Sequence, residues 1–125
     1  MHRSRLAGFI IDCPTTDLES AAGFWSSALG MAPQPLEGDR YVPLDSSARD
    51  LVIEVQRVDH PARLHLDIQT DNLPAEVRRL ERLGARAVGM VRTFMVMESP
   101  TGQRFCIVNA RDLTNAAGVN VWDDE

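Results

Sequence analysis

One pattern of elements occurs twice in the sequence, and this repeat limits the folds open to the chain more than any single motif does. Each copy begins with a short apolar run typical of a strand, at 9–13 and at 64–68. A helix with an apolar stripe is predicted after each run, and a glycine, Gly30 or Gly84, ends each helix. Three shorter strands are expected after each helix, so the sequence predicts two βαβββ modules.

Capping residues mark where the two helices begin. Thr16 and Glu19 have the spacing of a capping box, in which each side chain satisfies a free backbone donor. In the second copy, Asp71 or Asn72 caps the helix, and Pro74 stands near its start, where a missing N–H does no harm. Each helix is therefore expected to follow the first strand of its module directly.

Apolar runs and turn signals predict the shorter strands. They are expected near 31–34, 40–44 and 51–58 in the first module, and at 86–91, 93–98 and 104–109 in the second. The fold class is α+β, with a single domain over 1–125. Module one covers about 5–58, module two about 61–110, and a C-terminal tail 111–125. Because Trp122 is costly to leave in water, we expect the tail to dock on the body or on a second subunit.

Composition and charge exclude several classes of protein. Of 125 residues, 44% are hydrophobic and 25% are charged, as in ordinary globular domains. Thirteen basic and eighteen acidic residues give a net charge of −5. This charge argues against nucleic-acid and membrane partners and favours a neutral or cationic small molecule. The apolar stretch 6–11 is too short for a signal peptide or a membrane span, so we expect a cytoplasmic protein.

Cys13 and Cys106 lie outside any CxxC motif. Strand alternation directs Cys13 towards the first helix and Cys106 towards the opposite face of the sheet. A disulfide requires Cβ atoms within about 4.5 Å, so we expect two free thiols.

The two modules resemble the vicinal oxygen chelate superfamily, which includes glyoxalases, bleomycin-resistance proteins and extradiol dioxygenases, and in particular its glyoxalase-like domain. The likeness covers residues 5 to 110 and is carried by the segments 63–68, 71–77, 80–85 and 96–106. The turn Ser99-Pro100-Thr101-Gly102 is similar to the superfamily's aspartate-proline-x-glycine hairpin, with Ser99 in place of the aspartate.

The resemblance implies an architecture. Each module would curl its sheet into half of a cup, and the two halves would close around one ligand cavity. The result would be a cupped, eight-stranded mixed sheet with the helices on the outside. Superfamily members usually pair, so we expect a homodimer. Whether the cup forms within one chain or across a dimer stays open.

The resemblance also implies positions for a metal. Metal-dependent members use one inward side chain from the first and last strand of each module, and these positions are Ile10, Glu54, His65 and Cys106. Glu54 and His65 match the superfamily pattern, whereas Ile10 cannot bind metal and Cys106 replaces a carboxylate. We therefore expect no resident cofactor. A divalent metal on His65 and Glu54, with Cys106 completing a zinc set, remains the alternative.

The same residues also have structural interpretations. His65 could hydrogen-bond Asp67 or Glu54 across the sheet, and Glu54 could meet solvent at the rim. Cys106 could be a small buried hydrophobe. The remaining residues expected to line the pocket are Tyr41, Gln56 and Phe94. Whether Phe94 or Met95 points inward depends on one residue of hairpin register, which the sequence leaves open.

Two functional hypotheses follow. The first is a small-molecule-binding protein that holds its ligand in the cup without a full metal site. The alternative is an enzyme, namely a metal-dependent lyase, isomerase or dioxygenase using Glu54 and His65. In the enzyme, the metal would polarise an oxygen of the substrate while Glu54 or a bound water moved a proton. The sequence does not decide whether catalysis occurs.

Overall fold

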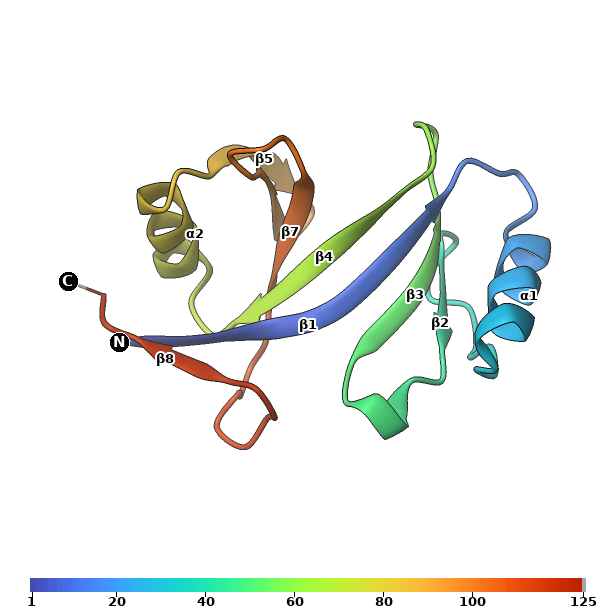
Figure 1. Cartoon of the computed structure of the whole chain (residues 1–125), viewed down its shortest axis with the longest axis horizontal. Coiled ribbons are helices and arrows are strands. Elements are labelled where there is room, and N and C mark those ends of the chain that lie inside the picture. Colours follow the sequence, from blue (N-terminus) through green and yellow to red (C-terminus); the bar gives the residue numbers. More distant parts are fainter. Residues whose placement is uncertain (125) are drawn as a thin grey trace. The chain divides into compact units, whose positions relative to one another are not determined.

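The computed structural model describes residues 1–124 and has an α+β fold with ten main elements (Figure 1). In chain order they are β1 (His2–Cys13), α1 (Leu18–Leu29), β2 (Tyr41–Leu44), β3 (Val52–Arg57), β4 (Arg63–Thr70), α2 (Leu73–Arg82), β5 (Arg86–Val91), β6 (Phe94–Glu98), β7 (Arg104–Asn109) and β8 (Asn120–Trp122). The strand order is β2-β3-β1-β4-β7-β6-β5, and β8 pairs with β1. The predicted mixed eight-stranded sheet with two helices is confirmed.

The chain divides into two compact units. One is Gly8–His65, called the α1 unit below, and the other combines Met1–Ala7 with Leu66–Glu125 and is called the α2 unit. Strands β1 and β4 each contribute residues to both units. Within residues 1–124, neither helix is long and apolar enough to cross a membrane.

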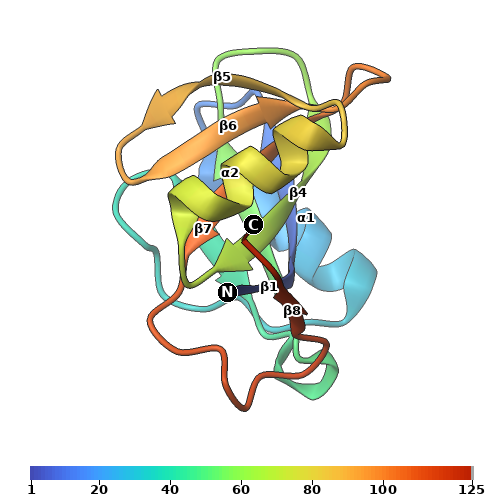
Figure 2. The same ribbon diagram turned by 90° about the vertical axis from the view of Figure 1, so that its left-hand side faces the viewer.

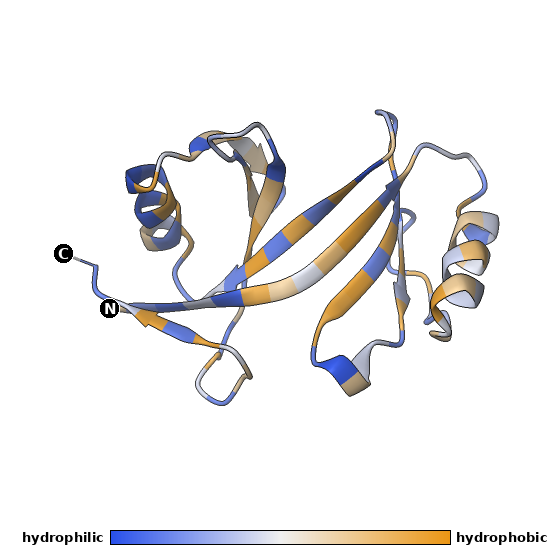
Figure 3. Cartoon of the chain, viewed as in Figure 1, coloured by the Kyte–Doolittle hydropathy of each residue, from blue (hydrophilic) through white to orange (hydrophobic). Residues whose placement is uncertain are grey.

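In the α1 unit, the helix covers one face of three strands. β1 pairs in parallel with β3, and β2 pairs antiparallel with β3. The core beneath the helix consists of Ala22, Met31, Val42, Leu44 and Val55. Cys13 and Trp25 pack against this core, as alternation along β1 and the helical stripe predicted. Figure 3 shows a polar band within β3, and alternation with Val55 directs Glu54 and Gln56 to the face away from the helix.

Two local predictions for the α1 unit were wrong. The helix is capped by Asp17 and not by a box of Thr16 and Glu19, because the Asp17 carboxylate accepts the backbone N–H of Ser20 at 3.1 Å. The segment 31–34 forms a single bridge, from Pro33 to Leu44, in place of a strand. Proline has no N–H to donate to a ladder, so pairing stops there. The eighth strand of the sheet is β8, from the tail.

In the α2 unit, four strands pack under the second helix (Figure 2). β4 pairs in parallel with β7, while β6 pairs antiparallel with β5 and β7. The core contains Leu80, Met97 and Ile107. Asn72 caps the helix by accepting the N–H of Ala75 at 3.1 Å, which decides between the two predicted caps.

The tail docks on the body through β8. His2 and Ser4 of β1 pair antiparallel with Trp122 and Asn120. The Trp122 indole N–H donates to the Ser4 hydroxyl at 2.8 Å. The Arg79 guanidinium lies 3.9 Å from the centre of the indole ring, a cation–π contact with α2.

A buried ionic network joins this tail to β1 and α2. Glu76 is fully buried and accepts from His2 Nε2 at 2.8 Å and from two Arg79 nitrogens at 2.7 and 2.9 Å. His2, 1% exposed, also meets Asp124 through Nδ1. Burial raises the pKa of Glu76, but hydrogen bonds from Arg79, His2 and Ser4 outweigh it and hold that pKa below its ordinary value.

Replacing Glu76 with Ala should lower the free energy of unfolding by about 3 kcal/mol, because the Arg79 guanidinium would lose its carboxylate and His2 one of its two partners. Urea unfolding followed by circular dichroism measures the change. Glu81→Ala is the matched control, since Glu81 is an exposed glutamate of the same helix, and it should cost less than about 0.5 kcal/mol. Equal losses in the two variants would contradict a buried network.

Acid should weaken the tail contact and the fold together. The pKa of Asp124 is lowered from 3.8 by hydrogen bonds from the N-terminal amine and His2, and that of Glu76 is lowered from 4.5. Both groups bind protons more weakly in the folded chain, so their stabilisation is complete above their unfolded pKa values and is lost as the pH falls through the folded ones. The urea midpoint should fall between pH 6 and pH 3, and Glu76→Gln should reduce that fall.

Candidate functional site

The face of the α1-unit sheet that points away from the helix carries most of the predicted site residues. Register pairs Ile10 and Pro43 with Glu54, and Asp12 and Tyr41 with Gln56. Alternation therefore places these side chains together on one face. The polar face is defined here as Ile10, Asp12, Tyr41, Glu54, Gln56 and His65.

Asp12 is a buried residue of the polar face that contacts several basic side chains. It is 2% exposed, and its Oδ2 atom accepts from His65 Nδ1 at 3.0 Å and from Arg63 Nε at 3.2 Å. His60 Nε2 lies 3.8 Å from the same oxygen, within ion-pair range. The other oxygen, Oδ1, is buried and has no hydrogen-bond partner among residues 1–124. A buried carboxylate is costly unless donors surround it, so this arrangement compensates one oxygen more fully than the other.

The contact with Asp12 fixes the orientation of His65. The His65 side chain is 9% exposed, so the ring is held within the sheet surface. An ionised carboxylate only accepts hydrogen bonds, so Nδ1 of His65 carries the proton. In the neutral ring, Nε2 is then the acceptor nitrogen. A carboxylate that orients an imidazole in this way is typical of histidines that bind metals or exchange protons.

Sequence reasoning missed Asp12, because it considered only Asp67 and Glu54 as hydrogen-bond partners for His65. A signal was present in the repeat: Asp12 lies two residues after Ile10 on the same strand face and aligns with Asp67 of the second copy. The partner could not be chosen from the sequence, because Asp12 and His65 are 53 residues apart and meet only through strand pairing.

Other polar residues of the face are also engaged. Gln56 Nε2 donates to the Tyr41 hydroxyl at 3.0 Å, so two of the predicted pocket residues contact each other. Glu54 is half-buried beside Ile10, which is 3% exposed. The structure thus brings five of the seven predicted site residues, those of the α1 unit, onto one surface.

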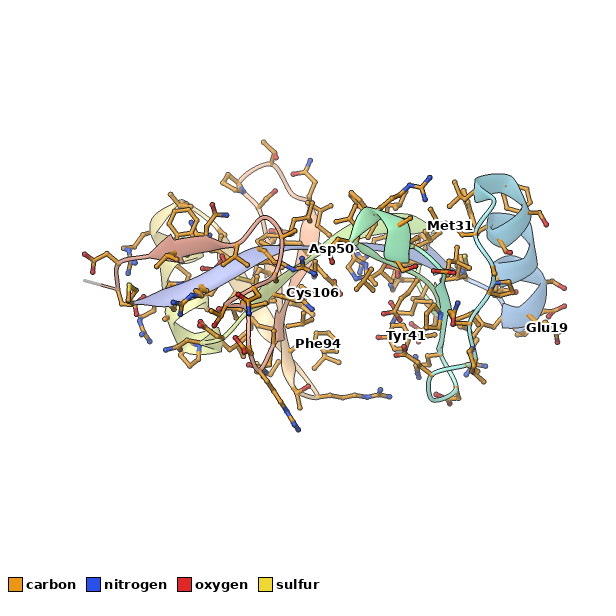
Figure 4. The ribbon with its side chains drawn as sticks, turned by 90° about the horizontal axis from the view of Figure 1, so that it is seen from below. Glu19, Met31, Tyr41, Asp50, Phe94 and Cys106 are labelled. Carbon is orange, nitrogen blue, oxygen red and sulfur yellow. The ribbon has the colours of Figure 1, made fainter. Side chains whose placement is uncertain are left out.

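The other two predicted residues, Phe94 and Cys106, belong to the α2 unit (Figure 4). Met95 packs in the core under α2, so alternation turns Phe94 to the opposite face. Val96 pairs with Cys106, which places Cys106 on the same face as Phe94. The register left open by the sequence is thereby settled for β6.

Both cysteines are free thiols, as predicted. Burial raises the pKa of the Cys13 thiol, which makes it a poor nucleophile near neutral pH. This agrees with a packing role for Cys13 beside Trp25.

A group of residues suited to a metal ion centres on β4. Asp67 pairs with Cys106 across β4 and β7, and His65 precedes Asp67 by two residues on the same strand face. His65, Asp67 and Cys106 offer an imidazole, a carboxylate and a thiol, which are the donor types that suit Zn²⁺. This group contains Asp67 where the sequence pointed to Glu54. Ile10, which stands at the ligand position of the first strand that the superfamily resemblance implies, has no donor atom. The residues therefore fit three protein ligands and not four.

The proton on His65 offers a direct test of the Asp12 contact. At pH 8.5, the neutral ring should carry its proton on Nδ1 in the native chain and on Nε2 in Asp12→Ala, because the variant has no acceptor at Nδ1. Two-dimensional ¹⁵N–¹H spectra of the histidine rings distinguish the two forms. Asp59→Ala, at an exposed carboxylate nearby in the chain, should leave the native form. The same tautomer in all three proteins would contradict the Asp12–His65 contact.

Comparison with known proteins places these residues in a family context. The family model described as a glyoxalase-like domain matches residues 8–108. No curated protein matches the chain.

Solved structures share the fold at low sequence identity. A hypothetical protein from Bacillus halodurans C-125 has a TM-score of 0.66 and 11% identity, over 87% of this chain and 96% of that one. Methylmalonyl-CoA epimerase from Mycobacterium tuberculosis has a TM-score of 0.63 and 16% identity, over 90% and 92%. The Mn(II)-bound glyoxalase from Novosphingobium aromaticivorans has a TM-score of 0.55 and 18% identity, over 90% of this chain and 44% of that one. At these identities, the likeness shows the fold alone.

Proposed function

The chain belongs to the glyoxalase-like domain family, and from this premise we propose that it is a small-molecule-binding protein whose ligand contacts the polar face of the α1 unit. Glu54, Gln56 and Tyr41 offer hydrogen-bonding groups there, and His65 supplies an oriented ring. The other side of the same strands packs against α1, so the polar groups have no role in the core beneath it.

The buried Asp12 carboxylate is the observation that carries this proposal. Three basic side chains converge on a single oxygen of Asp12, which is an expensive arrangement if its only purpose is to stabilise the strand. It does fix the ring of His65, a residue at a superfamily ligand position. Binding sites need such pre-oriented groups, because a side chain that is already held loses less entropy when a ligand arrives.

The ligand is proposed to be neutral or cationic. The net charge of −5 and the carboxylate of Glu54 on the polar face favour such a molecule over an anion. The sequence-based expectations of a single domain, a cup that also includes Phe94 and Cys106, a homodimer and a cytoplasmic location remain part of this proposal.

A metal-dependent enzyme is the second candidate, and the pairing of Asp67 with Cys106 beside β4 favours it. His65, Asp67 and Cys106 would hold the metal, which would supply polarisation of a substrate oxygen when bound. Asp12 would orient His65 as a ligand, and Glu54 would accept or return a proton.

Metal content separates the two candidates. Protein purified without chelator should contain far less than one metal ion per chain, and His65→Ala and Cys106→Ala should not change that value. Mass spectrometry of the metals in each preparation measures it. One equivalent of zinc or manganese that disappears in both variants would instead establish the metal-dependent candidate.

Ligand charge is tested with two probes, the cationic glycopeptide bleomycin and the anionic thioester methylmalonyl-CoA. Isothermal titration calorimetry should detect binding of bleomycin only, and His65→Ala should weaken it about tenfold through the loss of a charge-assisted hydrogen bond. Leu64→Ala is the control, because Leu64 is an exposed neighbour on the opposite face of β4. Preferential binding of methylmalonyl-CoA would contradict the proposed ligand charge.

A further inference from the structure

A cavity lies on the helix side of the α1-unit sheet, away from the polar face. It has a volume of about 560 Å³, within the range of small-molecule sites. Its walls come from α1, β2, the segment 33–39 and Arg57 at the end of β3. The apolar wall residues are Leu18, Ala22, Pro33, Leu36 and Val42.

Gly23 lines this cavity from the middle of α1. A Cβ atom placed on Gly23 would have no atom within 4 Å, so packing does not require a glycine there. Its backbone is helical, so no turn requires one either. Glycine inside a helix is unfavourable compared with alanine. Gly23 therefore has a cost that the fold does not explain, and its effect is to leave space beside the cavity open.

The charges on the rim define what the cavity can accept. Asp39 lies 3.6 Å from Arg57 Nη2 and 4.0 Å from Arg40 Nε, so its charge is compensated. Glu19 stands on the rim one turn before Gly23 (Figure 4). Within the part of the chain that the structure describes, Glu19 makes no ion pair or side-chain hydrogen bond. An uncompensated carboxylate beside apolar walls favours a cation with an apolar body.

We propose that this cavity is a second binding site, separate from the polar face, for a small amphipathic amine. The apolar body would lie between α1 and the segment 33–39, and the ammonium group would meet Glu19. The site rests on the α1 unit alone and does not depend on a ligand at His65.

Three probes that share an alkyl chain and differ in head group test whether the cavity prefers a cation. They are octylamine, 1-octanol and octanoate. In calorimetric titration of the full-length protein, octylamine should bind about threefold more tightly than 1-octanol, because its ammonium group would form an exposed ion pair with Glu19. Octanoate should bind more weakly than either. Glu19→Gln should remove the advantage of octylamine and leave 1-octanol unchanged.

Variants of residues that line the cavity test whether the probes bind there. Gly23→Leu should weaken octylamine and 1-octanol at least tenfold by occupying the space, and Gly23→Ala should raise Tm by about 3 °C. Ser27→Leu adds the same side chain to the exposed surface of α1 outside the cavity lining and should leave binding unchanged. If Gly23→Leu does not fold, Leu36→Ser replaces it, since Leu36 is 55% exposed and its loss should weaken both probes.

Several results would overturn the proposal. They are unchanged octylamine binding in the variant used to alter the wall, equal binding of octanoate and octylamine, or no binding of octylamine at all. His65→Ala should have no effect on octylamine. A loss of octylamine binding in His65→Ala would place the amine on the polar face and refute the second site, while leaving the function proposed for His65 intact.

Discussion

A carboxylate can be buried only where donors meet it, and each unit of this chain is arranged around one such group. In the α1 unit, Asp12 draws His65 and Arg63 of β4 onto β1. In the α2 unit, Glu76 binds His2 from β1 and holds Arg79, which in turn stacks on Trp122 of the tail. Because an unpaired charge would be costly at either place, these contacts decide which strands can lie beside β1 and how His65 is oriented.

Side-chain alternation explains why so much of the fold could be predicted from the sequence. The apolar residues of a strand that pack under a helix define one face of that strand. Side-chain alternation then assigns the remaining residues to the other face, without knowledge of distant contacts. Ile10, Glu54 and Cys13 were assigned correctly for this reason. The repeat added the second module, because the same local pattern must form the same unit. Strand faces and the repeated module could therefore be predicted from local sequence patterns.

Contacts between distant segments were outside the reach of such reasoning. The contact between His65 and Asp12 could not be predicted, and neither could the pairing of the tail strand β8 with β1. Each joins segments that are more than 50 residues apart in the sequence. Met95 rather than Phe94 packs under α2, and neighbouring β5 contains a register shift between Ala87 and Gly89 that parity alone cannot foresee. Asp17 and Thr16 both suit a helix cap, so the choice between them lay in backbone geometry.

Ile10 shows why membership of the family leaves the chemistry open. The fold is retained at 11–18% identity in solved structures, since it requires only apolar alternation and turns. A four-residue metal site requires a donor at each of the four positions, and the isoleucine in the first strand removes one. Any metal must then rely on donors along β4 and β7, where Asp67 pairs with Cys106. Ile10 is 3% exposed, so it contributes apolar packing beside Glu54 and no donor atom. One side chain in β1 therefore changes the set of donors available to a metal while the fold stays the same.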